Sequence, residues 1–291
     1  MTPSPILLGK LARAKLLTRW QAASVGVGER RSRAKGAGIE FADHREYQPG
    51  DDIKHLDPHL YARFGRHYIR QYDVYRQLPI TILVDASRSM NCGNPNKFAF
   101  ACGIASSLGF VGLAGGDGVQ IGVCAGEMVN WSPRFHGVAR SQRMFDWIGA
   151  QQSMNSGEFG SSLLTATRRF TDPGLVIVLS DWWTNDPENH IRILSATGQE
   201  IWGIQIASQE ELDPDLLGEG EARLFDIENG HEIELALDRS TRERYVREFE
   251  VWREQLQGLF TRVNGRYVLV PSNQSMDRLL LQDWRHLGLI G

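Results

Sequence analysis

The sequence has few cysteines and no long apolar run, and each shortage excludes a class of protein. Its 291 residues include three cysteines, Cys92, Cys102 and Cys124, an odd number without CxxC spacing. This pattern excludes a disulfide framework and a typical zinc site, and it indicates a reducing compartment. No stretch approaches the roughly 20 consecutive apolar residues that cross a bilayer. We therefore expect a soluble, cytoplasmic protein without a membrane span.

The N-terminus also lacks the charged start, apolar run and small-residue cleavage site of a secretory signal. Its first 28 residues contain no Asp or Glu but carry Lys10, Arg13, Lys15 and Arg19. This is the composition of an organelle transit peptide, which is the alternative to a cytoplasmic location. Apolar residues between these bases predict a basic amphipathic helix before Gly26. We favour its packing on the main domain over a membrane-surface position.

Charge is unevenly distributed along the chain. Apolar residues make up 42% and charged residues 23% of the sequence, so disorder is excluded. The net charge is −3, yet residues 1–77 hold 14 Lys+Arg against 8 Asp+Glu, and the remainder holds 18 against 27. A basic front and an acidic back suggest regions with different roles.

The middle of the chain alternates between short apolar runs and helical patterns. Residues 29–77 lack periodicity and are rich in Gly, Asp, Arg and Tyr. From Leu78 onward the pattern predicts an α/β fold, a doubly wound and mostly parallel sheet with helices on both faces. The strands are expected at 78–84, 119–125, 128–131, 175–180 and 200–207, and the helices at 97–114, 140–151, 161–170 and 189–197.

The last part of the chain predicts an extension of this domain. Two short runs, 223–227 and 232–237, flank Glu228-Asn-Gly230, whose Asn-Gly pair is a hairpin turn signal. A charged helix is expected at about 240–262, a strand at 267–270 and a terminal helix at about 275–287. We therefore expect an N-terminal helix and ordered segment at 1–77, the α/β domain at 78–207, and a hairpin and helical extension at 208–291 packed on it.

Two acids follow buried strands of the predicted sheet. The first strand leads into Asp85-Ala-Ser87-Arg-Ser89, and the third leads into Ser180-Asp181-Trp182-Trp183. Ligands of open parallel sheets bind beyond the carboxyl ends of the strands. Two carboxylates with two hydroxyls suit a hard cation such as Mg²⁺. The alternative is that these residues only cap helices and form turns.

These motifs resemble a known family. The strand, the Asp-x-Ser-x-Ser run and the later Ser-Asp resemble the von Willebrand factor A fold with its metal-ion-dependent adhesion site, over Leu78 to about Ala207. The run from Gly36 to Asp57 (GAGIEFADHREYQPGDDIKHLD), with Ala62-Arg63 and 68–72, resembles the signature of bacterial proteins called domain of unknown function 58. The likeness continues through 225–230 and Tyr245.

The resemblance implies a metal site and its ligands. It places metal ligation on Asp85, Ser87, Ser89 and Asp181, with Mg²⁺, or else Mn²⁺ or Ca²⁺, as the ion. It also expects a threonine in the loop before the helix at Ser161, where this chain has Glu158. Ser161 is the nearest hydroxyl. A third carboxylate would offset more of the metal's charge, or the site is degenerate.

The resemblance also implies a function. A metal held by hydroxyls and few carboxylates keeps a position that an acidic residue of a partner protein can complete. Members of the family commonly accompany MoxR-type AAA+ ATPases, which implies a non-catalytic, chaperone-like adaptor for an unknown client. A Mg²⁺-dependent phosphohydrolase is the enzymatic alternative. The sequence contains no Walker-type loop, His-Glu-x-x-His or Gly-x-Ser-x-Gly motif that would support it.

Two further surfaces are candidates for partner binding. Arg45, Glu46, Asp51 and Asp52, with neighbouring charges, predict an ion-pair network that fixes the 36–57 segment on the sheet domain. The alternative is a docking surface that also includes Tyr47. Trp182 and Trp183 either line a contact surface or pack under the next helix. Basic residues from Arg30 to Arg70 raise nucleic-acid binding, but interleaved acids favour an ordinary solvated face.

Overall fold

The computed structural model describes residues 2–19, 39–74, 77–153, 158–218, 221–225, 232–236 and 238–291. It divides into two compact units, which we call the sheet unit (Met1–Gly26 with Leu78–Gly291) and the hairpin unit (Val27–Gln77). The predicted 1–77 segment is therefore split, and its first part groups with the sheet. Leu7 and Leu11 of the first helix are buried, which agrees with packing on the main domain rather than on a membrane.

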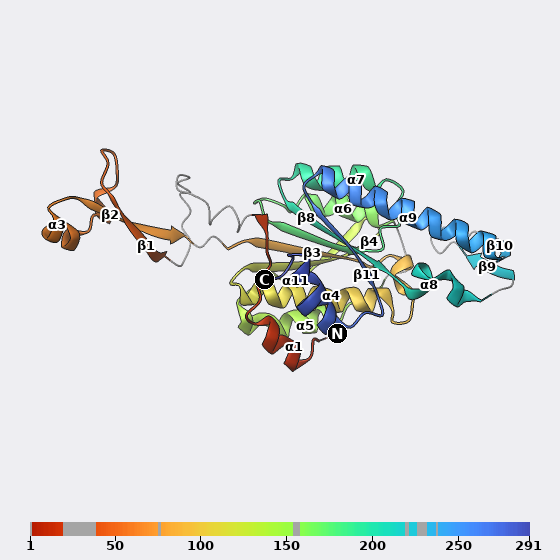
Figure 1. Cartoon of the computed structure of the whole chain (residues 1–291). Helices are drawn as coiled ribbons and strands as arrows, with labels where there is room; N and C mark the ends of the chain where they lie inside the picture. The colour runs from red at the N-terminus through yellow and green to blue at the C-terminus, as the bar shows by residue number, and fades with distance from the viewer. Residues whose placement is uncertain are drawn as a thin grey trace. The chain divides into compact units, whose positions relative to one another are not determined.

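The sheet unit is built on one mixed sheet (Figure 1). The strand order is β11-β8-β7-β3-β4-β5, and β6 also pairs with β4. The first five strands in this order are mutually parallel, whereas β5 and β6 run antiparallel to β4. The bounds are β3 (Pro79–Asp85), β4 (Gly118–Ala125), β5 (Met128–Trp131), β6 (Phe135–His136), β7 (Leu175–Ser180), β8 (Glu200–Ala207) and β11 (Arg266–Pro271).

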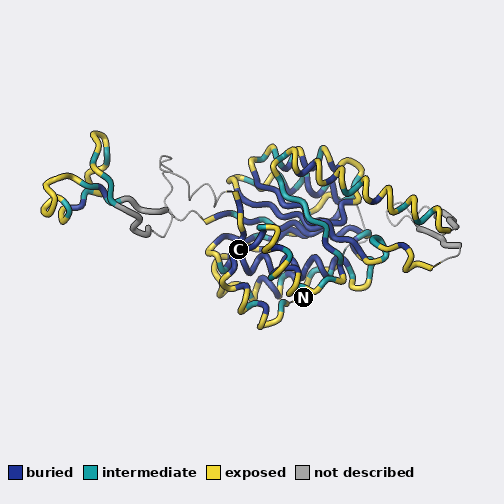
Figure 2. The backbone as a smooth tube through the Cα atoms, in the orientation of Figure 1, coloured by how far each residue is buried: buried dark blue, intermediate teal, exposed yellow. Residues whose placement is uncertain are grey.

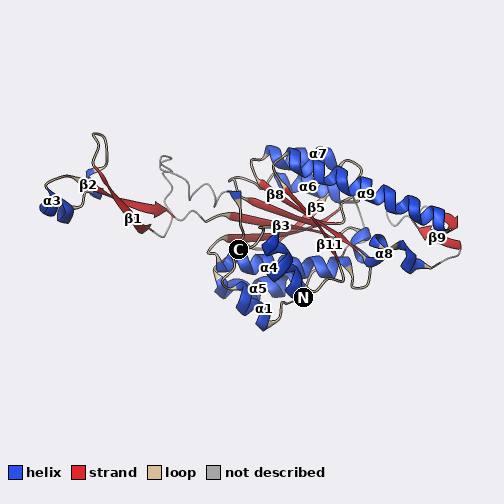
Figure 3. Cartoon of the chain, viewed as in Figure 1, coloured by secondary structure: helices blue, strands red, loops and turns tan. Residues whose placement is uncertain are grey.

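Helices cover both faces of this sheet (Figure 3). One face carries α1 (Pro5–Leu11), α4 (Lys97–Ala114) and α5 (Ser141–Gly149), and the other carries α6 (Phe159–Thr167), α7 (Pro187–Ala196) and α9 (Arg239–Arg262). Two hydrophobic clusters fill these layers, one for each face. Figure 2 shows the buried residues gathered along the strands. The order, directions and layers agree with the predicted von Willebrand factor A-like α/β fold.

The central helix α4 corrects the expectation that no stretch of the chain is long and apolar enough to cross a bilayer. Among the described residues it is the one helix long and apolar enough to cross a membrane, and 83% of that window is buried inside the protein. Gly109 and Gly112 let it approach the side chains of Met144 and Ile80, which a Cβ would meet within 3.0 Å. The helix therefore has the environment of a core helix.

The hairpin unit contains regular structure where we predicted an aperiodic segment. β1 (Ile39–Glu46) and β2 (Tyr68–Val74) pair antiparallel, and they flank the 3-10 turn Ile53–His55 and α3 (Pro58–Phe64). The Asp57 carboxylate caps the N-terminus of α3, and it also accepts a hydrogen bond from Arg70 Nε at 2.8 Å. Residues 20–38, which include Gly36, Gly38 and the bases from Arg30 to Lys35, lie outside the described residues.

The C-terminal extension follows the prediction closely. β9 (Glu221–Phe225) and β10 (Glu232–Ala236) form the expected antiparallel hairpin, although its Asn-Gly turn lies outside the described residues. Between β8 and β9 lie α8 (Gln209–Leu212) and a 3-10 turn, Pro214–Leu217. The terminal helix consists of α10 (Met276–Arg278), a π-helical turn (Leu279–Asp283) and α11 (Trp284–His286).

Candidate functional site

The two predicted acids meet at the carboxyl end of the sheet. β3 and β7 are adjacent parallel strands, so their C-terminal residues lie at the same edge. Asp85 is the last residue of β3, and Asp181 directly follows β7. Both carboxylates are buried, with 1% of each residue exposed. The sequence-based pairing of these two acids is therefore present in the structure.

Asp85 is fixed by two hydrogen bonds. The Ser180 hydroxyl donates to one carboxylate oxygen at 2.5 Å, and the Ser87 backbone N–H donates to the other at 2.8 Å. Burial, followed by the nearby charge of Asp181, raises the pKa of Asp85 to about 7. Asp85 is therefore a carboxyl group that does not easily carry a charge in this setting.

Asp181 is oriented by a sharp turn of the backbone. Trp182 adopts a positive φ of 62°, which is uncommon for a residue with a side chain. The Ser180 hydroxyl accepts from the Trp182 N–H at 2.9 Å, and Gln205 donates to the Asp181 carbonyl at 3.0 Å. This turn directs Trp182 into the core and brings Trp183 to the surface.

A lysine that the sequence analysis did not select lies against Asp181. The Lys97 Nζ is 2.9 Å from Asp181 Oδ2 and 2.8 Å from Glu211 Oε1. The whole residue is 0% exposed. Burial lowers the pKa of Lys97, but Asp181 and Glu211 outweigh burial and the pKa is raised. The ammonium therefore stays charged, and it holds the two carboxylates together.

The two motif serines lie beside this group. The segment after Asp85 does not stay extended but forms a 3-10 turn, Arg88–Asn91. Even so, the Ser87 and Ser89 hydroxyl oxygens are 3.0 Å apart. Ser87 is buried and Ser89 is half-buried. The motif therefore supplies a pair of hydroxyls at the same edge of the sheet as the acids.

Glu158 and Ser161, the two other predicted metal ligands, form hydrogen bonds with α6 and with the loop after Asp181. Glu158 precedes α6, and its carboxylate accepts from the Thr184 hydroxyl at 3.2 Å and from the Asn185 N–H at 3.1 Å. It therefore fastens the loop after Asp181 to the start of α6. Ser161 lies in the first turn of α6, where its carbonyl accepts from the Thr165 hydroxyl.

The donor set does not fit a Mg²⁺ ion as it stands. Asp181, which would be an anionic ligand, already faces the ammonium of Lys97. Both oxygens of Asp85 accept hydrogen bonds from protein groups. The Mg²⁺ site stays a prediction of the motif, and the ammonium argues against it.

The two tryptophans of the motif have different environments. Trp182 is fully buried, in edge-to-face contact with Phe159 and with Phe260, so it has no surface for a partner. Trp183 is 37% exposed. Its ring stacks on Trp252 of α9, with centroids 5.9 Å apart and planes 3° apart. Of this pair, only Trp183 can contact another protein in this conformation.

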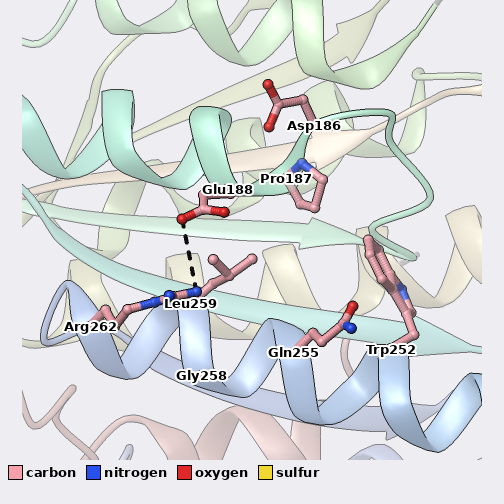
Figure 4. A pocket seen from close by; sticks show the side chains of 8 residues that line it. All are labelled: Asp186, Pro187, Glu188, Trp252, Gln255, Gly258, Leu259 and Arg262. Atoms are coloured by element: carbon pink, nitrogen blue, oxygen red, sulfur yellow. Dashed lines mark ion pairs between the residues drawn. The ribbon is translucent and has the colours of Figure 1, made fainter.

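An open groove continues from this stack along α9. Its volume is about 720 Å³, and it lies between the start of α7 and α9. Figure 4 shows Trp252 at one end and the ion pair between Glu188 and Arg262 at the other, with the paired atoms 3.9 Å apart. The groove is therefore lined by an aromatic side chain at one end and by a pair of opposite charges at the other.

The charged residues predicted to bind a partner in the hairpin unit pair mainly within that unit. Arg45 contacts Asp51 at 2.6 Å, and Glu46 contacts Arg66 at 2.9 Å. Asp52 caps the 3-10 turn through the Lys54 N–H. Tyr47 lies edge-on to His67, with ring centroids 6.4 Å apart. The predicted network thus stabilises the hairpin unit itself; a docking role for these residues stays a prediction.

Sequence reasoning missed Lys97, Ser180 and Glu211, and one signal pointed to the first of these. Lys97 is the only charged residue in the 97–114 segment. A lone cation at the start of an apolar helix needs a buried acid as a partner. Glu211 belongs to a capping box with Ser208, which the Ser-x-x-Glu spacing could have indicated.

Known proteins that are similar to this chain include two mycobacterial relatives. "Uncharacterized protein Rv1480" of Mycobacterium tuberculosis is 26% identical over 252 residues, which cover 84% of this chain and 78% of the relative. "Uncharacterized protein Mb1516" of Mycobacterium bovis matches to the same extent. Two solved structures are weakly similar: BatB from Bacteroides thetaiotaomicron (TM-score 0.42, 16% identity, 72% of this chain and 98% of that chain) and the SpRpn10 VWA domain (TM-score 0.41, 11% identity, 69% and 92%). The model of one family, described as "Protein of unknown function DUF58", matches residues 43–255, and the chain belongs to that family.

Proposed function

We propose that this chain is a non-catalytic protein-binding adaptor whose contact surface is the carboxyl end of the sheet. One observation carries the proposal: Trp183, which follows Asp181 directly, is partly exposed and braced by Trp252. Tryptophans held in place by a second ring are typical anchors of protein interfaces because little side-chain entropy is lost when they bind.

The surroundings of Trp183 support this role. The ring of Phe249, which is buried, also lies against Trp183, with ring centroids 6.3 Å apart. Glu158 fastens the loop that carries the tryptophan. Aromatic rings of α9 on one side and the loop fastened by Glu158 therefore hold the anchor in place.

The proposed partner is a MoxR-type AAA+ ATPase, with a client protein that the pair assembles or matures. This part of the proposal rests on the family resemblance, whereas the cytoplasmic location is proposed from the cysteine pattern and the lack of a signal sequence. Mg²⁺ assistance is predicted by the Asp-x-Ser-x-Ser motif, but the Lys97 ammonium beside Asp181 argues for binding without it. Among the described residues, we find nothing that favours the phosphohydrolase or nucleic-acid alternatives.

The test is a capture experiment with matched variants. The full chain is immobilised and exposed to native lysate of the source cells, and bound proteins are identified by mass spectrometry with and without EDTA. We expect a MoxR-type ATPase to be retained in both conditions. Affinity for the purified ATPase should fall at least tenfold in Trp183→Ala, a loss of about 1.4 kcal/mol or more.

Trp131→Ala is the control variant. Trp131 is a partly exposed tryptophan on β5 whose ring is covered by the Arg169 guanidinium at 5.2 Å. Its replacement should leave the affinity unchanged. Equal losses in both variants, or binding that Trp183→Ala does not weaken, would remove the support for this surface.

A further inference from the structure

Lys97 has an unusual position for a cation. It is the first residue of α4, an 18-residue helix. The N-terminus of a helix carries a partial positive charge, so a lysine there is electrostatically unfavourable. Lys97 is also completely buried, which lysines tolerate only when they are paired. A strong local attraction must therefore hold this side chain in place.

The attraction comes from the acids at the strand ends. Asp181 Oδ2 and Glu211 Oε1 each lie within 2.9 Å of Nζ. Glu211 is itself fixed, because its second oxygen accepts from the Ser208 N–H at 2.6 Å. Two carboxylates from separate parts of the chain thus hold the ammonium.

We propose that the Lys97 ammonium is the resident cation of this site and takes the place of a divalent metal ion. It neutralises Asp181, the acid that the motif assigns to the metal, and it joins this acid to α8 through Glu211. A tethered ammonium has no coordination position for an outside ligand. The site therefore acts as an internal clamp between β7, α4 and α8.

This inference goes beyond the proposed function, and it holds whether or not the chain binds an ATPase. The carboxylate of a partner has no access to a cation that is 0% exposed. The contact surface then relies on groups such as Trp183, and the clamp contributes by fixing the loop that carries this residue. Chelators should leave both the fold and the binding unchanged.

The first experiment uses the unmodified full chain. Its thermal unfolding is followed in EDTA and in millimolar Mg²⁺ or Mn²⁺, and Mg²⁺ binding is measured by calorimetry. We expect the same Tm in all three conditions and no heat of binding. A Tm raised by metal, together with calorimetric binding that Asp85→Ala abolishes, would overturn the proposal.

The second experiment removes the ammonium. Lys97→Ala leaves the buried carboxylate of Asp181 and the half-buried carboxylate of Glu211 without their shared cation, and we expect its Tm in EDTA to fall by roughly 10 °C. Mg²⁺ or Mn²⁺ should restore part of this loss by occupying the vacated position, and Lys97→Ala combined with Asp181→Asn should lose the restoration. Lys10→Ala, at an exposed lysine of α1, is the control and should behave like the unmodified chain. A Lys97→Ala protein that is as stable as the control, or that metals do not stabilise, would contradict the proposal.

Discussion

Ser180 is the residue whose removal tests most sharply how the site is held together. Its hydroxyl donates to Asp85 at 2.5 Å and accepts from the Trp182 N–H at 2.9 Å. Both partners are buried. Ser180→Ala therefore leaves a carboxylate oxygen and a backbone N–H without their partner, inside the protein.

The expected cost follows from these two orphaned groups. Each buried polar group that loses its hydrogen bond costs about 1–3 kcal/mol, so Ser180→Ala should lower the free energy of unfolding by about 3 kcal/mol. Ser106 offers a matched control because it is equally buried, at 0%. Its hydroxyl donates only to the Cys102 carbonyl, at 2.8 Å, and Ser106→Ala should cost about 1 kcal/mol or less.

Denaturant unfolding followed by tryptophan fluorescence is a suitable assay. The hairpin unit, residues 27–77, contains no tryptophan in its sequence, so the signal does not report on that unit. We expect Ser180→Ala to unfold at a clearly lower denaturant concentration than Ser106→Ala, with a similar slope. Equal midpoints for the two variants would show that the Ser180 bridge between Asp85 and Trp182 does not stabilise the fold, and our account of the site would fail.

Two other predictions concern the body of the sheet unit. Burial raises the pKa of Asp117 to about 6 from 3.8, so its charged form destabilises the fold increasingly as the pH rises through this window. Asp117→Asn keeps an acceptor for the Leu78 N–H. In chemical unfolding, the free energy of unfolding of this variant relative to the unmodified chain should rise by up to about 3 kcal/mol between pH 4 and 7. A difference in stability that does not change with pH would contradict this. Gly203→Ala would place a Cβ 2.0 Å from the Phe260 ring and should lower the free energy of unfolding by about 2 kcal/mol or more. Gly258→Ala, which has open space around its Cβ, should raise it by up to about 1 kcal/mol. The same shift in Tm for both variants would refute the packing argument.

The strands and helices of the sheet unit were predictable because burial imposes a pattern on them. β7 is apolar throughout and is buried on both faces, and α9 follows a helical repeat of apolar residues. The hairpin of β1 and β2 was missed because a two-stranded ribbon buries little surface and leaves a weak pattern. Element type was therefore clearest where two layers cover a strand.

The candidate site was predictable only in part. Asp85 and Asp181 were found because strand ends of a parallel sheet converge by topology. Lys97 was not found because its partners lie 84 and 114 residues away in the sequence. Glu158 illustrates the same limit, since its carboxylate bonds to the loop at Thr184 and Asn185, a pairing that only the folded chain reveals.

Hydrogen–deuterium exchange of the full chain, with and without its captured ATPase partner, tests most directly whether the carboxyl end of the sheet is the contact surface. We predict that the partner slows exchange in peptides covering 86–92 and 181–186, in EDTA as well as in Mg²⁺. Protection confined to the hairpin unit or to the β5 edge, with 181–186 unchanged, would contradict the account.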